Sequence, residues 1–342
     1  MGVIGPIPVP DLGPIQPFGL LVATGVLLGS RIVFWRSAKK GLGEDWPRRG
    51  VLAVLVGAFL FSHWVERLYY VPGPLFESWG PLELLAFWAG MSSFGGFIGA
   101  LYGLMLFTGW SEASKQERNL SLALPTVAAL TAYLSLTLAQ LLFPVAVLAG
   151  IFLLRRSDGR RIVFADALVE GLIPGWVFGR AGCTLVYDHP GHVSDWALAM
   201  VDHSGIARHN LGLYELMLTA LVLLPLVYLL RALEKKPGLV TSVVTMAYAP
   251  ARFMMDYYRI PATEGGDPRY FSLTAGQYSS ILLFLACLAI LVVTQRGTPK
   301  PIPEPVEPPP RGGGAQKAEA GGTKGSGQRA GGKKGKNKKR KK

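Results

Sequence analysis

Eight ionisable residues lie inside long apolar stretches of this 342-residue sequence. Keeping a charged side chain at the centre of a lipid bilayer costs at least about 2.5–3.5 kcal/mol, so each is a candidate for chemistry or binding. Four of them fall at a similar depth, in the outer half of the bilayer, at a rise of about 1.5 Å per helical residue. We expect these four to line one polar cavity that opens to the outer leaflet. They are His63, Arg180, Glu215 and Arg252, and the other four are Glu66, Arg67, Glu170 and Asp256.

Two arginines at this depth, Arg180 and Arg252, suggest phosphate binding. The planar fork of arginine N–H donors matches phosphate oxygens, and a phospholipid headgroup is the phosphate available at that depth. Gly179 precedes Arg180, and Gly95 and Gly96 lie in another apolar stretch, where small residues let a backbone approach a ligand. Helix packing is the alternative explanation for the glycines, and an ion pair within its own helix is the alternative for Arg252.

The apolar stretches are long enough to cross a bilayer, which takes about 20 residues. Half of all residues are hydrophobic, 17% are charged and the mean hydropathy is +0.33, which excludes a largely disordered chain and disfavours a soluble enzyme. The stretch 120–154 is too long for one span and slightly short for two, so we expect an inserted helical hairpin there. We therefore predict an all-α, polytopic membrane protein with this hairpin and seven spans: 14–35, 51–71, 84–110, 164–187, 211–233, 239–258 and 273–293.

Basic residues mark one side of the predicted membrane domain, residues 1–297. Lys and Arg follow the first, third and fifth spans and flank the hairpin on both sides, whereas the other loops are mainly acidic. Because cytoplasmic loops carry the excess of Lys and Arg, we predict the N-terminus outside and the C-terminus inside. No basic residue precedes Arg31, which argues against a cleaved signal peptide.

Residues 298–342 form a basic tail. They carry thirteen Lys or Arg and three Glu, or +10 of the net charge of +13, which leaves +3 for residues 1–297. The tail is rich in Pro and Gly and poor in large apolar residues, so we predict that it is disordered and cytoplasmic. Binding to anionic lipid headgroups is the favoured role, at about 1 kcal/mol per basic residue. Contact with RNA or the ribosome is the alternative, although we expect no nucleic-acid partner for the protein.

Metal and cofactor sites are not indicated. Cys183 and Cys287 are too few for a disulfide framework and lack the spacing of metal ligands. We expect Cys183 to be a small buried thiol.

Five stretches, in order and at matching membrane positions, resemble the bacterial prolipoprotein diacylglyceryl transferases, inner-membrane enzymes with seven spans. The resemblance covers most of residues 14–295 apart from the hairpin. It implies transfer of the diacylglyceryl group of phosphatidylglycerol to the lipobox cysteine of preprolipoprotein signal peptides, with release of glycerol phosphate. The stretches are GMSSFGGFIG (90–99), DALVEGLIPGWVFGRAG (166–182), HNLGLYEL (209–216), YAPARFMMDYYR (248–259) and LTAGQYSSI (273–281).

The resemblance also implies roles for individual residues. Arg180 falls on the family arginine that binds the lipid phosphate, and Arg252 falls on its second essential arginine. Tyr214 and Glu215 fall in the family's Leu-Tyr-Glu motif, and Tyr248 begins the stretch around Arg252. Arg180, Tyr214, Glu215 and Tyr248 are candidates for binding phosphatidylglycerol, and Arg252 is a candidate catalytic residue that takes up charge on the leaving phosphate.

The sequence departs from the family mainly where a proton must be handled. The family usually has a histidine before the paired glycines, where this chain has Phe94, and the family pattern after the arginine is altered at Cys183. A thiol that attacks carbon must lose its proton, which calls for a base with a pKa near 7. Our candidates are His189 first, then His63, then His209. The alternative is that the field of the arginines ionises the thiol without a base.

Three functions remain open from the sequence. The first is the diacylglyceryl transferase. The second is a family paralogue that binds lipid or modifies another acceptor, which the missing histidine suggests. The third is a membrane transporter, which the buried charges and Pro- and Gly-interrupted helices suggest, although no inverted repeat is evident.

Overall fold

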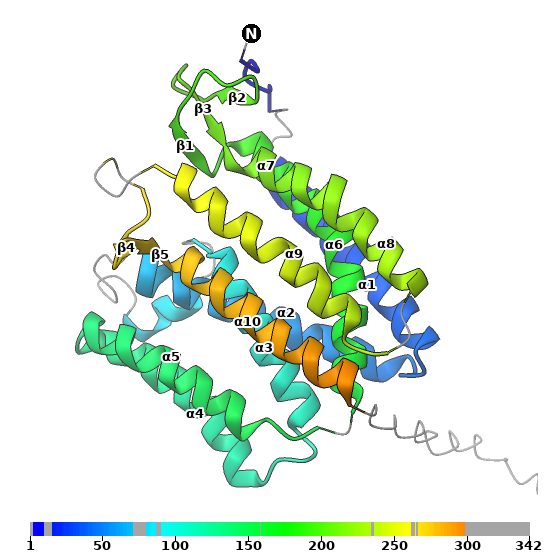
Figure 1. Ribbon diagram of the computed structural model, residues 1–342. Helices are drawn as coiled ribbons and strands as arrows, with labels where there is room; N and C mark the ends of the chain where they lie inside the picture. Colours follow the sequence, from blue (N-terminus) through cyan, green and yellow to red (C-terminus); the bar gives the residue numbers. More distant parts are fainter. Residues whose placement is uncertain are drawn as a thin grey trace, which may run out of the picture. The chain divides into compact units, whose positions relative to one another are not determined.

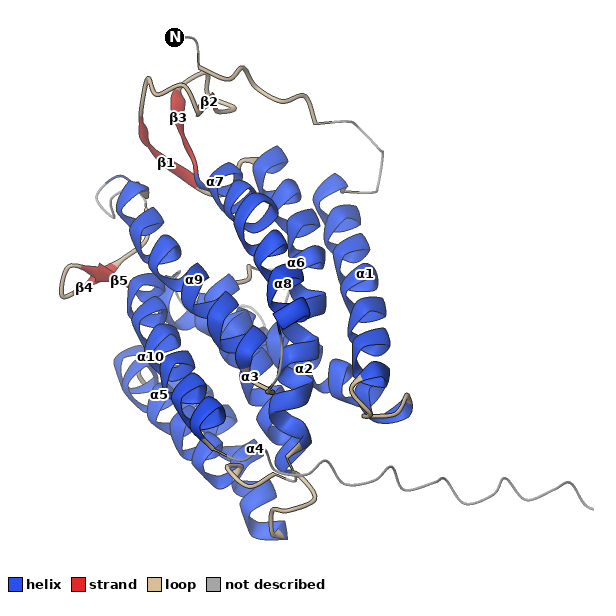
Figure 2. Cartoon of the chain, turned by 45° about the vertical axis from the view of Figure 1, so that its right-hand side comes forward, coloured by secondary structure: helices blue, strands red, loops and turns tan. Residues whose placement is uncertain are grey.

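The computed structural model describes residues 3–9, 16–70, 80–86, 90–157, 159–233, 236–260, 264 and 266–297. The predicted tail, residues 298–342, lies outside them. Helices make up most of the described chain, and a small sheet lies at one end of the helical bundle (Figures 1 and 2). The predicted all-α class is confirmed, since the described residues are mostly helical and their strands are short.

The helices and strands follow in chain order. The α-helices are α1 (Pro17–Lys39), α2 (Asp45–Val65), α3 (Ser93–Gly109), α4 (Lys115–Leu130), α5 (Leu136–Leu153), α6 (Arg160–Val186), α7 (Leu211–Met217), α8 (Leu224–Leu233), α9 (Leu239–Met255) and α10 (Ala275–Arg296). Two π-helical segments cover Glu66–Tyr70 and Leu218–Leu223, and 3-10 turns cover Gly80–Leu85, Thr131–Tyr133 and Asp256–Tyr258. The strands are β1 (Pro190–Val193), β2 (Ala199–Val201), β3 (Ala207–Asn210), β4 (Arg269–Tyr270) and β5 (Leu273–Thr274).

Six helical segments of the described residues are long and apolar enough to cross a membrane. These segments are consistent with the predicted polytopic membrane protein. The number of spans and their orientation stay predictions. The six are Pro17–Lys39, Asp45–Tyr70, Leu136–Leu153, Arg160–Val186, Leu211–Leu233 and Ala275–Arg296.

The third predicted span, 84–110, is shorter in the structure than the sequence indicated. Gly80–Leu85 is a separate 3-10 turn, and α3 begins only at Ser93 and has 17 residues. The late start has a local cause, because Gly90 has a φ of +118° and interrupts any helix there. Ser92 then caps the new helix by accepting a hydrogen bond from the Gly95 amide at 3.3 Å.

The small sheet between α6 and α7 was not predicted. Its strands run antiparallel in the order β1-β3-β2, and each has only three or four residues, too few for a clear alternating pattern. Asp202 organises the turn between β2 and β3. Its carboxylate accepts hydrogen bonds from the amides of Ser204 at 2.9 Å and Ile206 at 3.0 Å.

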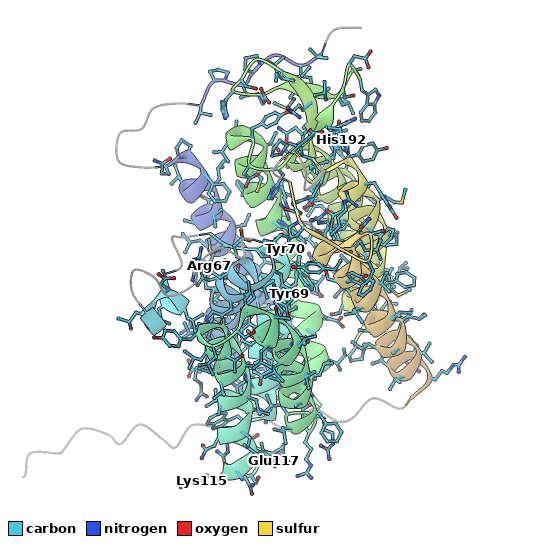
Figure 3. The ribbon with its side chains drawn as sticks, turned by 90° about the vertical axis from the view of Figure 1, so that its left-hand side faces the viewer. Arg67, Tyr69, Tyr70, Lys115, Glu117 and His192 are labelled. Carbon is cyan, nitrogen blue, oxygen red and sulfur yellow. The ribbon has the colours of Figure 1, made fainter. Side chains whose placement is uncertain are left out.

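The region predicted as a hairpin contains α4 and α5. Ser114 and Glu117 form a capping box at the start of α4, and Ser135 caps α5. The two helices pack on each other, and α5 also packs on α2 through a contact between the rings of Phe61 and Phe143. Lys115 and Glu117 lie at the end of the bundle opposite His192 of the small sheet (Figure 3).

Close glycine packing positions α6, which carries much of the candidate site. A Cβ on Gly25 of α1 would lie 2.3 Å from the carbonyl oxygen of Gly175, and one on Gly171 would lie 2.4 Å from that of Gly29. Only glycine permits this approach of the two helices. Gly57 and Gly99 join α2 and α3 in the same way.

Candidate active site

Arg180 and Arg252 meet at one carboxylate. Arg180 Nη2 lies 2.6 Å from Glu215 Oε2, and Arg252 Nε lies 3.2 Å from Glu215 Oε1. The three residues come from α6, α9 and α7, and only 3%, 9% and 2% of Arg180, Arg252 and Glu215 are exposed. The structure therefore brings together three of the predicted site residues from different helices.

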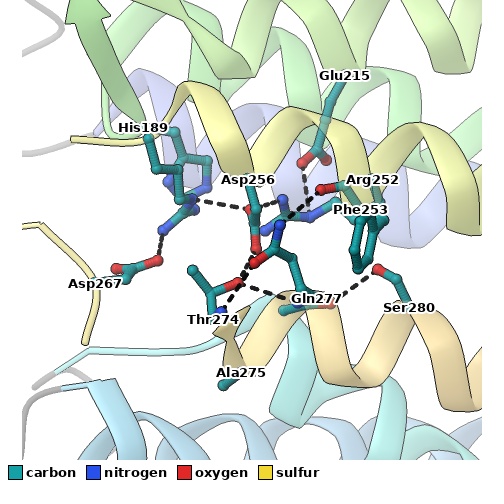
Figure 4. A network of polar contacts seen from close by, with 12 residues as sticks. His189, Glu215, Arg252, Phe253, Asp256, Asp267, Thr274, Ala275, Gln277 and Ser280 are labelled. Carbon is teal, nitrogen blue, oxygen red and sulfur yellow. Dashed lines mark hydrogen bonds and ion pairs between the residues drawn. The ribbon is translucent and has the colours of Figure 1, made fainter. Parts of the chain in front are cut away.

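The ion pairs continue from Arg252 to the C-terminal end of α9 and the loop that follows it (Figure 4). Asp256 pairs with Arg252 and lies 3.3 Å from Arg259 Nε, and Arg259 also pairs with Asp267. The predicted ion pair within the helix of Arg252 is thus present, but it belongs to a longer chain of three arginines and three acids. Its full extent was not predicted, because Asp267 lies in a loop whose path the sequence does not give.

Asp256 is held from a second direction by the start of α10. Thr274 donates its hydroxyl hydrogen bond to Asp256, and Thr274 and Gln277 form the capping box of α10. Gln277 also donates to the carbonyl oxygen of Phe253 at 3.3 Å. A Cβ on Gly276 would lie 2.3 Å from Asp256 Oδ2, so this position requires glycine. The stretch 273–281 was singled out, but these contacts could not be read from it.

The network is buried among the helices, and the predicted cavity beside it stays a prediction. The sequence predicted that His63, Arg180, Glu215 and Arg252 line an open polar cavity, whereas the last three are buried on one another. Because each buried charge needs a partner, the arginines and acids pack together. A surface depression lined in part by Arg31, Trp35 and Arg48 lies between α1 and α2 and contains none of the four.

The glycine candidates differ in their surroundings. A Cβ on Gly95 would lie 2.4 Å from the carbonyl oxygen of Phe61, so close packing of α3 against α2 accounts for this glycine. The nearest atoms to a Cβ on Gly96 lie 4.0 Å away, and Gly179 has only an atom of the Trp176 ring at 3.9 Å. Their role in binding lipid stays a prediction.

The two tyrosine candidates occupy different places. Tyr248 is buried one helical turn before Arg252, with its ring 5.0 Å from that of Trp176. Tyr214 instead faces the small sheet, where its hydroxyl group lies 2.7 Å from Nδ1 of His209. His209 is therefore a partner of Tyr214 at the small sheet.

His63 is a fully buried residue that links segments of backbone. Its Nδ1 lies 3.1 Å from the carbonyl oxygen of Gly90, and its Nε2 lies 2.7 Å from that of Glu83. These contacts tie α2 to the segment before α3, which is a structural role. In the same region, Arg67 pairs with Glu83 at 3.6 Å.

His189 follows α6 and lies beside Cys183 and Asp188. One ligand-type atom from each of the three residues lies within 4.8 Å of the others. The His189 side chain is 25% exposed, and Arg180 Nη1 lies 3.7 Å from Cys183 Sγ. The sequence placed His189 near Arg180 by proximity alone, and the structure agrees with that placement.

The surroundings of His189 make its imidazole less basic. Burial lowers the pKa of His189 well below its usual value, and the positive charges of Arg259, Arg180 and Arg252 lower it further. The imidazole is therefore neutral at pH 7. A base with so low a pKa removes a proton from a thiol less readily than an ordinary histidine.

Two other buried acids, Glu170 and Asp166, and the aromatic Phe94 make contacts that hold helices together. Three cationic groups, from Arg36, Lys40 and Arg231, surround Glu170, and Asp166 accepts hydrogen bonds from the amides that begin α9. Phe94 packs against the apolar cluster of α2 and α5. No base occupies its place.

Comparison with known proteins gives one consistent family. The family model of prolipoprotein diacylglyceryl transferase matches residues 9–136 and 143–293, which include all of α4 and most of α5. The hairpin that we expected to be an insertion thus lies mostly within the family match.

Three relatives are each named phosphatidylglycerol–prolipoprotein diacylglyceryl transferase. The protein of Janthinobacterium sp. is 26% identical over 262 residues, which covers 75% of this chain and 78% of the relative. The protein of Nitratidesulfovibrio vulgaris is 24% identical and covers 82% and 90%, and that of Rhodospirillum rubrum is 28% identical and covers 65% and 67%. Together with the long apolar helices, these matches indicate a multi-pass bacterial membrane protein. The chain belongs to the prolipoprotein diacylglyceryl transferase family.

Proposed function

We propose that this protein transfers the diacylglyceryl group of phosphatidylglycerol to the lipobox cysteine of preprolipoproteins and releases glycerol phosphate. The names of its relatives state this donor and this acceptor. The observation that carries the proposal is the buried pair of arginines, Arg180 and Arg252, on the single carboxylate of Glu215.

The arginines suit the leaving group of this reaction. When a thiolate displaces phosphate from a glycerol carbon, the phosphate gains negative charge as the C–O bond breaks. Fixed cations at that place lower the barrier, because they need no reorganisation as the charge develops. Arg180 Nε is buried and has no hydrogen-bond partner among the described residues, so it is available to a phosphate oxygen.

Glu215 supports the arginines in this account. Two cationic groups at one buried place repel each other, and the carboxylate between them reduces that repulsion. Asp256 does the same for Arg252 and Arg259. We propose that the lipid phosphate binds beside Glu215 and shares the N–H donors of Arg180 and Arg252.

The acceptor thiol approaches from the side of His189 in this proposal. His189 and Cys183 adjoin Arg180, whereas His63 is held by backbone carbonyl oxygens of Gly90 and Glu83. This favours His189 over His63 as the histidine that handles the thiol.

We further propose that the protein lies in the cytoplasmic membrane with this site toward the outer leaflet. The alternating basic and acidic loops support that orientation. Signal peptides would then reach the site from the bilayer, and the basic tail would contact anionic lipid on the cytoplasmic side.

Complementation tests this function directly. Expression in a bacterium depleted of its own transferase should restore growth and diacylglyceryl modification of a reporter lipoprotein. Arg180→Gln should fail to do so, and Arg48→Gln should succeed, because Arg48 is a surface residue with a 61% exposed side chain. Inserted wild-type protein that leaves the reporter unmodified would overturn the proposal.

A further inference from the structure

Three side chains at the end of α6 form a cluster that the sequence did not predict. We propose that Cys183, Asp188 and His189 bind a zinc ion, and that this ion takes the acceptor cysteine as its fourth ligand and holds it as a thiolate. The inference rests on the proposed transferase function and names the group that activates its thiol. The sulfur, carboxylate oxygen and ring nitrogen of the three residues lie within 4.8 Å of one another.

An unusual helix end builds this cluster. Tyr187, directly after α6, adopts a left-handed conformation with φ 56° and ψ 39°, which residues other than glycine rarely adopt. The turn brings Asp188 and His189 back toward Cys183, which lies one turn earlier in the helix. Such backbone strain persists where the surrounding contacts impose it, and it is concentrated at functional sites.

Hydrogen bonds hold the backbone on both sides of the turn. The Tyr187 hydroxyl group lies within hydrogen-bond distance of two carbonyl oxygens, of Met200 at 2.8 Å and Arg208 at 3.0 Å. The carbonyl oxygen of His189 accepts a hydrogen bond from the amide of Leu211 at 3.1 Å. The sheet and α7 therefore fix the ligands that follow the helix, as an orienting shell does in metal sites.

The ligand types fit zinc. Zinc binds cysteine sulfur, histidine nitrogen and aspartate oxygen, and a site with three protein ligands leaves the fourth tetrahedral position for a substrate. Bonds of about 2.0–2.3 Å place tetrahedral ligand atoms roughly 3.3–3.8 Å apart. His189 Nε2 and Asp188 Oδ1 are 3.8 Å apart, so small side-chain rotations complete the geometry.

The charges also agree with a zinc-bound thiolate. A Cys183 thiolate and the Asp188 carboxylate neutralise the ion, and a second thiolate from the acceptor makes the site negative. Arg180 Nη1, 3.7 Å from Cys183 Sγ, faces that negative charge. The charge of Arg180 itself is already balanced by Glu215, which limits repulsion of the incoming ion.

A zinc ion at this cluster would activate the acceptor thiol, a task for which the chain has Phe94 in place of the usual histidine. A thiol bound to zinc is deprotonated, so no side chain needs to act as a base with a pKa near 7. The phosphate site at Arg180 and the sulfur site at Cys183 are three residues apart, a rise of about 4.5 Å along the helix. This spacing lets a bound sulfur reach the glycerol carbon next to a bound phosphate.

The reaction balances with zinc as an added cofactor. On binding, the acceptor thiol gives its proton to solvent. Its sulfur electron pair then forms the S–C bond as the bond between the glycerol carbon and the phosphate oxygen breaks. The phosphate oxygen keeps that electron pair and leaves with glycerol phosphate. The product is a neutral thioether, a weak zinc ligand that dissociates.

Cobalt substitution tests the metal site without relying on turnover. The purified full-length protein, stripped of metal in detergent micelles, should bind about one Co²⁺ per chain and show thiolate-to-cobalt charge-transfer absorption. Cys183→Ser should abolish that absorption, and Asp188→Asn and His189→Gln should each weaken Co²⁺ binding on the order of 10–100-fold. Cys287→Ser, Asp195→Asn and His192→Gln are the matched controls and should bind as the wild type does. Unchanged absorption in folded Cys183→Ser would overturn the proposal.

A second experiment adds a lipobox peptide to the cobalt-loaded protein and measures the same charge-transfer absorption. A lipobox peptide should strengthen the charge-transfer absorption, because it adds a second thiolate, and a Ser-substituted peptide should not. If wild-type protein transfers lipid with a strong chelator present and no metal bound, the zinc proposal fails and the transferase function stands. If the peptide thiol enters the cobalt shell but no lipid is transferred with any metal, the metal site stands and the transferase function fails.

Discussion

Arg180 and Arg252, 72 residues apart in the sequence, bind opposite oxygens of the same buried carboxylate, that of Glu215. This arrangement fixes two cationic groups at one buried place among α6, α7 and α9. A pair of arginines has no need to meet for helix packing alone. In the proposed function, a lipid phosphate, which accepts from several N–H donors at once, binds both arginines.

Replacing the shared carboxylate should destabilise the fold. Glu215→Gln leaves Arg180 and Arg252 without their common counter-charge, and breaking a buried ion pair typically costs about 3–5 kcal/mol. Denaturant unfolding in detergent micelles should therefore show a clear loss relative to wild type. Glu112→Gln, at an exposed position, is the control and should unfold as wild type does. Equal stability of the two variants would contradict the charge-bridging role.

His63 should matter for stability more than for chemistry. His63→Ala removes contacts to two partly buried carbonyl oxygens, and a buried acceptor left without a partner costs up to about 1–3 kcal/mol. The folded fraction should therefore fall, while turnover per folded molecule stays near wild type. His192→Ala, at an exposed position, should change neither quantity. A folded His63→Ala protein that has lost turnover would instead identify His63 as the base.

The length of the apolar stretches and the charges inside them predicted the helical class and the meeting of Arg180, Glu215 and Arg252. The family was predicted from the resemblance of five stretches of sequence. The sequence did not predict that Glu215 pairs with both arginines, since the rotation of each helix depends on packing such as that of Gly25 on Gly175. The cluster of Cys183, Asp188 and His189 was also missed. These three residues come together only because Tyr187 adopts a left-handed conformation. A tyrosine at that position does not predict such a conformation.

Both ends of the α4–α5 hairpin should lie on the cytoplasmic side. Single cysteines at Ser114 and Ser157, placed before α4 and after α5, should both resist a membrane-impermeant thiol reagent added from outside. Both should react in inverted vesicles. Labelling of one from outside and the other from inside would contradict the hairpin topology.

The basic tail should be dispensable for chemistry. Deletion of residues 311–342 removes no candidate site residue, so turnover in proteoliposomes should stay near wild type. Binding to vesicles that contain anionic lipid should weaken, because about 1 kcal/mol is lost per basic residue near the surface. Loss of turnover in inserted, folded protein would show that the tail takes part in the reaction.

The phosphate-binding role of Arg180 is the central claim, and one measurement tests it most directly. The rate of transfer from phosphatidylglycerol to a lipobox peptide would be compared among purified wild type, Arg180→Lys and Arg48→Lys. Mass spectrometry would quantify the diacylglyceryl peptide formed. Lysine keeps the charge but lacks the planar fork, so Arg180→Lys should lose about 100-fold or more in rate while Arg48→Lys matches wild type. A rate for folded Arg180→Lys within a few-fold of wild type would contradict the account.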